Sequence, residues 1–151
     1  EKKADVFMKT FNHLHSKFRE IFNNISTKGQ ASLVLENEEN PLDGGVDINV
    51  KISGSKKLDI RSLSGGEKTM AALAFIFAIQ EYNPASFYLL DEVDAALDKH
   101  NSEKLSKLIN TYSGTAQYIV ISHNDSIITE ANQIYGISMN EGVSKITSLR
   151  L

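Results

Sequence analysis

The side chains with the clearest chemical potential are two adjacent carboxylates, Asp91 and Glu92, which follow the apolar run Phe87–Leu90. Two carboxylates at the end of a buried strand are costly unless solvent or a partner compensates them. One interpretation is a plain polar exit from a strand. The functional interpretation makes Asp91 a ligand of Mg²⁺ or of its water shell, and makes Glu92 the base that activates an attacking water. On that interpretation the pair predicts the hydrolytic half of an α/β ATPase site.

A second motif, Ser64-Gly65-Gly66-Glu67, precedes a long apolar segment. Its simplest interpretation is a capping box, with Ser64 as the N-cap and Glu67 as the third helical residue. That interpretation does not explain two successive glycines, each of which costs about 1 kcal/mol inside a helix. Bare backbone at the positive end of a helix suits an approaching phosphate. The motif therefore predicts a phosphate cradle that is also a helix cap.

Acidic residues and a histidine follow the predicted strands. Asp98 lies where it can cap the next helix, and Asp94 belongs to the same acidic turn. His123 comes after the apolar run 117–121 and is separated from it by one serine. A histidine at a strand end is commonly solvated or a cap, but at the carboxyl edge of a parallel sheet it can reach a γ-phosphate. The remaining histidines have no partner at metal-ligand spacing and are interpreted as surface residues: His13, His15 and His100.

The sequence lacks one motif that a complete P-loop ATPase needs. No G-x-x-x-x-G-K-[ST] phosphate loop occurs in the 151 residues. The chain also does not begin with Met, so we expect it to be a fragment of a longer protein. It carries one half of a nucleotide-hydrolysing site and needs the other half from elsewhere.

The composition excludes several classes of protein. The chain has no cysteine, which excludes disulfides and thiolate metal sites and fits an intracellular protein. Its longest strongly apolar run, Met70–Ile79, is too short to span a bilayer. The net charge of −3 gives no global attraction for nucleic acid, so a DNA contact needs a local basic patch. The candidates for that patch are Lys56, Lys57 and Arg61.

Apolar periodicity predicts the elements that position these groups. The order is typical of an α/β fold with antiparallel edges. The predicted helices cover Asp5–Ile25, Glu67–Tyr82, Asn101–Tyr112 and a short stretch after Asp125. The predicted strands are Ala31–Glu36 with Val46–Ile52 as a hairpin, Phe87–Leu90 and Gln117–Ile121 as buried strands, and Gln133–Met139 with Val143–Leu149 as a terminal hairpin. Ser53–Ser62 is predicted to be a polar loop. The apolar middle of the second helix predicts deep burial, and Phe87–Leu90 a central parallel position.

In this order the motifs resemble those of the ATP-binding-cassette superfamily. Leu63–Glu67 is similar to its signature motif, Phe87–Glu92 to Walker B, Ala95–Asp98 to the D-loop, and His123 to the switch histidine. Three longer strings, Leu63–Lys68, Tyr82–Ala85 and Leu90–Asp98, resemble the C-terminal head segment of the structural maintenance of chromosomes (SMC) family. The resemblance covers nearly the whole chain. The histidine favours a prokaryotic, archaeal-type member.

The resemblance implies an architecture. Residues 1–28 would be a coiled-coil stump, although the apolar pattern alone favours a core-packing helix. Residues 29–151 would be the C-terminal lobe of an ABC-type P-loop ATPase head, with a mostly parallel sheet, flanking helices and antiparallel edge hairpins. An N-terminal segment of the same SMC protein, beyond a long coiled coil and hinge, would carry Walker A and complete the head.

The resemblance also implies roles and partners. Glu92 and His123 would be catalytic, with Asp91 and Asp98 also at the nucleotide and Asp91 linked to Mg²⁺. Ser64, Gly65, Gly66 and Glu67 would contact the γ-phosphate of ATP on a second head, so that ATP joins the two heads. A kleisin-type subunit and DNA are the further implied partners, with no membrane. The implied location is cytoplasmic and nucleoid-associated, or nuclear in a eukaryote.

Three other classes of protein are alternatives to an SMC head. SMC-like repair or recombination ATPases, of the zinc-hook or RecF and RecN type, share these motifs; Val93–Ala96 argues against the repair ATPase, where Pro-Thr-like residues commonly follow the Asp-Glu pair. A non-catalytic binding module is disfavoured by intact Ser64, Asp91, Glu92 and His123. A transporter cassette does not suit the first helix and the long hairpin. Homodimers and heterodimers are not distinguished by the sequence.

Overall fold

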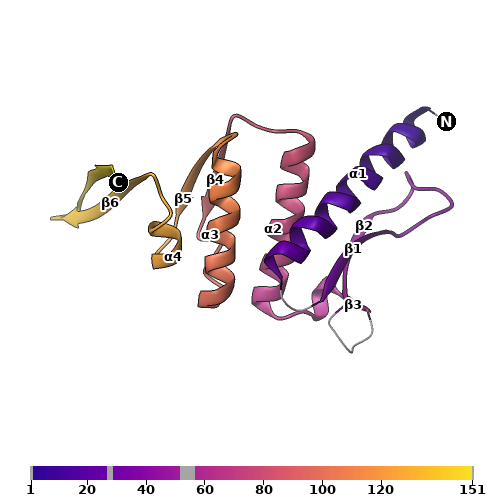
Figure 1. Cartoon of the computed structure of the whole chain (residues 1–151), viewed down its shortest axis with the longest axis horizontal. Coiled ribbons are helices and arrows are strands. Elements are labelled where there is room, and N and C mark those ends of the chain that lie inside the picture. Colours follow the sequence, from indigo (N-terminus) through magenta and orange to yellow (C-terminus); the bar gives the residue numbers. More distant parts are fainter. Residues whose placement is uncertain (1, 27–28, 52–56, 151) are drawn as a thin grey trace.

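The computed structural model describes residues 2–26, 29–51 and 57–150. Its helices are α1 (Lys2–Ile25), α2 (Gly65–Tyr82), α3 (Lys99–Ser113) and α4 (Asp125–Ile128), with a 3₁₀ turn η1 (Ile60–Ser62). Its strands are β1 (Gln30–Leu35), β2 (Val46–Lys51), β3 (Lys57–Asp59), β4 (Phe87–Asp91), β5 (Gln117–Ile121), β6 (Gln133–Asn140) and β7 (Val143–Arg150). Figure 1 shows the three long helices beside one another, with β1–β3 next to α1 and the β6–β7 hairpin at the opposite end. The predicted α/β class is confirmed.

The strands form three small sheets. β1, β2 and β3 are antiparallel neighbours, which confirms the predicted first hairpin. β4 and β5 pair in parallel, with Phe87 opposite Gln117 and Asp91 opposite Ile121. β6 and β7 form the predicted terminal hairpin. Its turn residues Glu141 and Gly142 both have positive φ, 49° and 79°, as a type I′ turn requires.

One hydrophobic core joins α1 to β1, β2, α2, β4, α3 and α4. The buried residues of α1 are confined to its last two turns: Phe18, Ile21, Phe22 and Ile25. They pack with α2, where the ring of Phe75 meets Phe18 edge-on at 6.2 Å between centroids. Near the start of the helix, by contrast, Val6 is 61% exposed. The second half of α1 is thus a core-packing helix, while a continuation of the helix and a boundary at residue 28 stay predictions.

Two predictions about local structure are wrong. The segment Ser53–Ser62 is not simply a loop, since it contains β3 and η1; residues 52–56, including Lys56, lie outside the described residues. A strand of only three residues has too little periodicity to be detected in a sequence. His15 is not a surface residue, because its half-buried ring places Nδ1 3.0 Å from the carbonyl oxygen of Leu33.

The predicted burial of α2, β4 and β5 is only half correct. One side of each element faces the core, as Phe77 and Leu90 show. The other side is open in this chain and carries Ile76, Ile79, Phe87, Leu89, Ile119 and Ile121, which are 41–59% exposed. In the described part of the chain β4–β5 is a two-stranded sheet, so no central position for β4 is seen. No helix in the described residues is long and apolar enough to cross a membrane.

A polar network ties the three long helices together. Lys17 Nζ of α1 lies 3.0 Å from Glu81 Oε2 of α2, and Tyr112 of α3 donates its hydroxyl to Glu81 Oε1. Burial opposes ionisation of Glu81, but the hydrogen bonds from Tyr112 and Lys17 outweigh it and hold the carboxyl pKa below its usual value. The same contact with Glu81 raises the pKa of Lys17. Burial, reinforced by the bond to Glu81, raises the pKa of Tyr112.

We expect Glu81→Gln to lower the free energy of unfolding by about 1 kcal/mol, because a partly exposed charged network is weaker than a buried one. The depressed pKa of Glu81 adds stability above its ordinary value of 4.5, and this is lost as pH falls through the lowered pKa. The raised pKa of Tyr112 adds stability below its ordinary value of 10.0, lost at higher pH. The difference between wild type and variant should therefore be flat from about pH 5 to 10 and shrink on both sides.

Urea unfolding at pH values within that range and on both sides of it measures this difference. Glu20→Gln is the matched control, because Glu20 also contacts Lys17, at 3.1 Å, but its side chain is 60% exposed. Its effect should be the smaller of the two. Equal losses in both variants would contradict a special role for Glu81.

Candidate functional site

The end of β4 is where the two adjacent carboxylates lie. The Glu92 N–H donates to Ile121 O at 2.9 Å, which extends the parallel pairing one residue beyond Asp91. Glu92 has φ of 47°, in the left-handed region that costs a side-chain-bearing residue roughly 1–2 kcal/mol. The turn continues with an Ala95 N–H bond to Glu92 O at 3.1 Å. Such local strain is commonly retained where a side chain has a task, and here it sets the direction of the predicted base.

The structure brings Glu92 and His123 together. His123 Nε2 lies 3.5 Å from Glu92 Oε1, although the two residues are separated by α3 and β5. The reason is the parallel register, which places the ends of β4 and β5 at one edge of the sheet. Both side chains face solvent, with 90% of the histidine and 57% of the glutamate exposed. A base and a polar donor at one open sheet edge can act on a ligand that arrives there.

Asp91 is exposed beside this pair. The described residues contain no cluster of three or more His, Cys, Asp or Glu that could enclose a metal. A single carboxylate suits Mg²⁺, which commonly keeps several waters and takes its other ligands from a substrate's phosphates. The residues present therefore fit an ion that would be completed by a nucleotide.

The turn before α2 is the predicted capping box. Ser64 N donates to Glu67 Oε2 at 3.0 Å, and Glu67 N donates to Ser64 Oγ at 3.4 Å. Gly65 and Gly66 are the first two helical residues. At these two positions the N–H groups have no acceptor within the helix. These two donors and the loosely held serine hydroxyl are available to an anion.

The two glycines have different reasons to be there. A Cβ at Gly66 would lie 3.1 Å from Ala96 O, so the turn after β4 packs directly against this residue. The phosphate interpretation alone therefore does not account for Gly66, whose small size is needed for packing. A Cβ at Gly65 would meet nothing closer than 3.9 Å, so packing does not demand this glycine.

Asp98 caps α3 as predicted, because its Oδ1 accepts a hydrogen bond from Asn101 N at 2.8 Å. It also lines a pocket of about 270 Å³ together with the signature turn. The residues of that pocket are Phe22, Ser26, Val50, Ser64, Gly66, Glu67, Met70, Ala96, Asp98, His100 and Asn101. Asp91, Glu92 and His123 are not among them. The predicted site residues thus form two groups, one at the signature turn and one at the sheet edge.

Sequence reasoning missed a buried polar cluster behind the sheet edge. Asp94 is only 6% exposed, and Ser122 Oγ donates to its Oδ2 at 2.7 Å. The sequence offered one signal, since Ser122 and Asn124 flank the predicted histidine. The pattern of a single acidic turn did not reveal which of its carboxylates points inward.

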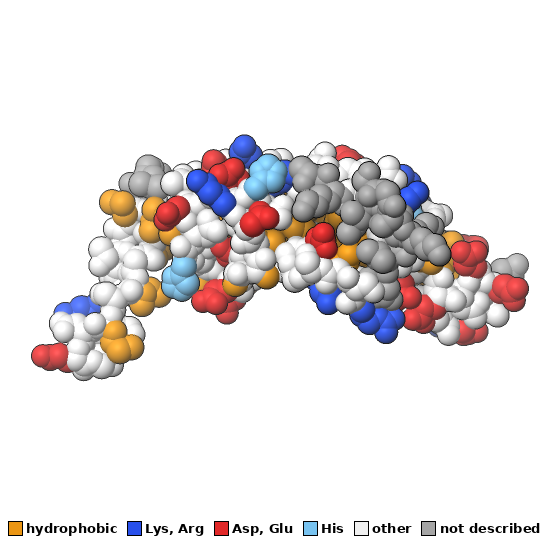
Figure 2. Space-filling model, turned by 90° about the horizontal axis from the view of Figure 1, so that it is seen from below, with side chains coloured by type: hydrophobic (Ala, Val, Ile, Leu, Met, Phe, Trp, Pro, Cys, Tyr) orange, Lys and Arg blue, Asp and Glu red, His pale blue; other side chains and the backbone are white. Residues whose placement is uncertain are grey.

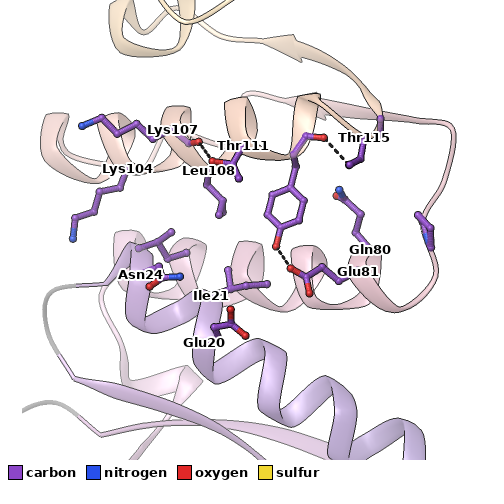
Figure 3. Close-up of a pocket in the computed structure, with 14 residues that line it drawn as sticks. Glu20, Ile21, Asn24, Gln80, Glu81, Lys104, Lys107, Leu108, Thr111 and Thr115 are labelled. Carbon is purple, nitrogen blue, oxygen red and sulfur yellow. Dashed lines mark hydrogen bonds between the residues drawn. The ribbon is translucent and has the colours of Figure 1, made fainter.

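A larger hollow of about 700 Å³ lies between α1, α2 and α3. Figure 3 shows Lys104 and Lys107 on its α3 side and Glu20 and Glu81 across from them. The lining also includes apolar side chains such as Ile21. None of the sequence-predicted site residues lines this hollow.

The comparisons with known proteins agree with the motifs. A profile of the family described as RecF/RecN/SMC N terminal domain matches residues 3–145. The chain belongs to this family. The predicted resemblance to SMC proteins is confirmed by a relative, the chromosome partition protein Smc of Pyrococcus furiosus, which is 46% identical over 151 residues. The match covers 100% of this chain and 13% of that Smc protein.

Solved SMC structures share the fold. The Smc head domain of Pyrococcus furiosus, with an extended coiled coil and the C-terminal domain of ScpA bound, superposes with a TM-score of 0.93 at 46% identity. That match covers 99% of this chain and 37% of the other. A structure from work on ATP-driven dimerization and DNA stimulated activation of SMC ATPases gives a TM-score of 0.87 at 46% identity, covering 96% and 88%. The chain therefore has the fold of a segment of an SMC head.

Proposed function

We propose that this chain is the C-terminal part of an SMC ATPase head, which hydrolyses ATP when two heads meet and so serves chromosome condensation, segregation or DNA tethering. The observation that carries the proposal is the meeting of Glu92 and His123, 3.5 Å apart at one end of β4 and β5. The similarity to Smc proteins over the whole chain supports it. The activity of the whole protein is inferred, because the chain spans 13% of that relative.

The sheet-edge group would act on the nucleotide bound in its own head. Glu92, whose exposed carboxylate lies 3.5 Å from His123 Nε2, would orient the attacking water and accept its proton. His123 would donate a hydrogen bond to the γ-phosphate. Asp91 would hold Mg²⁺ through water, and the bound ion supplies positive charge to the phosphate oxygens.

The signature group would serve the opposing head. Ser64 Oγ and the N–H groups of Gly65 and Gly66 can donate to a phosphate at the positive end of α2. Glu67 would keep the turn in shape through its bond to Ser64 N. Asp98, in the same pocket, would lie at this shared nucleotide. ATP would then bridge two heads, and its cleavage would release them.

The open side of the β4–β5 sheet supports an N-terminal head segment as a partner. Phe87 and Leu89 are each 59% exposed, and the neighbouring strand exposes Ile119 and Ile121. The terminal hairpin also carries exposed Ile137, Met139 and Ile146. Figure 2 shows hydrophobic side chains at the surface of the end that carries this hairpin. Contiguous apolar surface of this kind marks a binding face, and the segment with Walker A would cover the sheet.

Further partners are proposed from the relatives. The matched Smc head of Pyrococcus furiosus is bound to the C-terminal domain of ScpA, so we expect a kleisin-type subunit on this head. DNA is a further expected partner, and the basic candidates within the described residues are Lys57 in β3 and Arg61 in η1. The expected location is the cytoplasm, at the nucleoid.

This chain alone should show no ATP turnover, because it lacks the Walker A segment. Mixing it with the N-terminal segment of its own protein should restore turnover. A coupled phosphate-release assay at increasing ratios of the two segments measures this. Glu92→Gln chain mixed in the same way is the control for a contaminating ATPase. Robust turnover by the pure chain would contradict the proposal of an incomplete site.

A further inference from the structure

The histidine at the sheet edge has little holding its own side chain in place. His123 is 90% exposed, and its described contact is with Glu92 at 3.5 Å. Its position must therefore be set by the backbone on either side. Both neighbours, Ser122 and Asn124, are anchored by hydrogen bonds.

The first anchor is a buried carboxylate. Ser122 Oγ donates to Asp94 Oδ2 at 2.7 Å, the usual length of a hydrogen bond between a hydroxyl and an oxygen acceptor. The same Ser122 Oγ accepts from Asn124 N at 2.9 Å, so one hydroxyl closes the loop around His123. Asp94 is 6% exposed, which keeps water from competing for its oxygen.

The second anchor lies in the core. Asn124 Nδ2 donates to the fully buried Ser102 of α3 at 3.0 Å, and Asn124 Oδ1 accepts from Ser126 N at 3.0 Å. Ser126 O in turn accepts from the hydroxyl of the buried Ser106 at 2.7 Å. The loop is therefore tied to α3 as well as to the turn after β4.

Asp94 links the loop around His123 to the turn after β4. Its side chain holds Ser122, while its backbone carbonyl accepts from Leu97 N at 2.9 Å and shapes the turn that leads to Asp98. The same turn after β4 also packs the Ala96 carbonyl against Gly66. If this turn shifts when the signature region meets another head, the loop around His123 should therefore shift with it.

We propose that Asp94 and Ser122 are positioning residues that hold His123 beside Glu92, a role that rests on the proposed function of that pair in ATP hydrolysis. They do not touch the reacting atoms. Their hydrogen bond keeps the histidine loop in register with the turn after β4, so that His123 reaches a γ-phosphate only while that turn is in place.

The test uses the full-length protein with Ser122→Ala and Asp94→Ala. Each should lower kcat by about tenfold to a hundredfold, the size expected when a catalytic group is misplaced by about 1 Å. KM for ATP and ATP-dependent head dimerisation should stay at wild-type values. Ser122→Thr and Asp94→Asn, which keep the donor and the acceptor, should restore most of kcat. The double alanine variant should be no worse than either single one.

Ser113→Ala is the matched control. It removes a hydroxyl bond of the same length, 2.7 Å to Asn110 O, at the far end of α3, and should leave kcat unchanged. Wild-type kcat in both alanine variants, a loss shared equally by dimerisation, or no restoration by the conservative variants would overturn the proposal.

A second measurement separates this proposal from the proposed function. Hydrogen–deuterium exchange of the peptide that spans Ser122–Asn124 should speed up in full-length Asp94→Ala, and return towards wild type in Asp94→Asn. Unchanged exchange in Asp94→Ala would show that Asp94 does not hold the loop. If the wild-type protein has no ATP turnover, the proposed function fails, but the exchange result still decides the role of Asp94.

Discussion

Full-length protein with Glu92→Gln should bind ATP, form stable head dimers and hydrolyse almost nothing. The change keeps the size of the side chain and removes its ability to take a proton from water, a contribution of about 10²–10⁴-fold in rate. Because the cleavage step is blocked and binding is spared, engaged heads should accumulate. Steady-state turnover and size-exclusion chromatography with ATP measure the two effects.

The matched control is Glu141→Gln. Glu141 is another exposed glutamate with positive φ, 49° against 47° for Glu92, and it lies on the turn of the terminal hairpin. It should leave both turnover and engagement unchanged. Monomeric heads in the Glu92→Gln protein with ATP would rule out the role given to Glu92, since an intact nucleotide should hold the dimer.

Ser64→Arg should have the second large effect. The substitution places a long cation at the turn that would meet the opposing nucleotide, at a position that is exposed in this chain. ATP binding to each head should persist, since Ser64 serves the other head. Engagement should weaken by about 2 kcal/mol or more, the size of a central interface contact, and turnover should fall with it.

Loss of the helix cap must be separated from obstruction of the interface. Ser64→Ala removes the same cap from α2 at a cost of about 1 kcal/mol in stability but adds no bulk. Engagement of the alanine protein should be impaired far less than that of the arginine protein. If Ser64→Arg leaves turnover unchanged, Ser64 is only a cap.

The local signals in the sequence were sufficient for the caps and for the order of elements. Ser64 and Asp98 each bond to a backbone N–H three residues later, so a short window contains the whole interaction. The meeting of Glu92 and His123 was also accessible, because strands that run in parallel bring their ends together. These features depend on neighbours along the chain or on one rule of sheet geometry.

The features that were missed depend on contacts between distant segments. The sequence near Gly66 does not indicate that Ala96 packs against it, and the sequence near Asp94 does not indicate that Ser122 donates a hydrogen bond to it. Apolar periodicity correctly marked Leu89 and Ile119 as residues that avoid water, yet both are exposed because the described chain has no layer over that side of the sheet. Apolar periodicity indicates that a residue should be buried, but it does not indicate which polypeptide buries it.

The open side of β4–β5 also changes what stability means for this molecule. If Phe87, Leu89 and their neighbours are covered by a separate segment, part of the folding free energy is a binding free energy. The melting temperature of a head built from two chains would then rise with protein concentration. Joining the two segments in one polypeptide would replace that dependence by a fixed effective concentration, set by whatever lies between them.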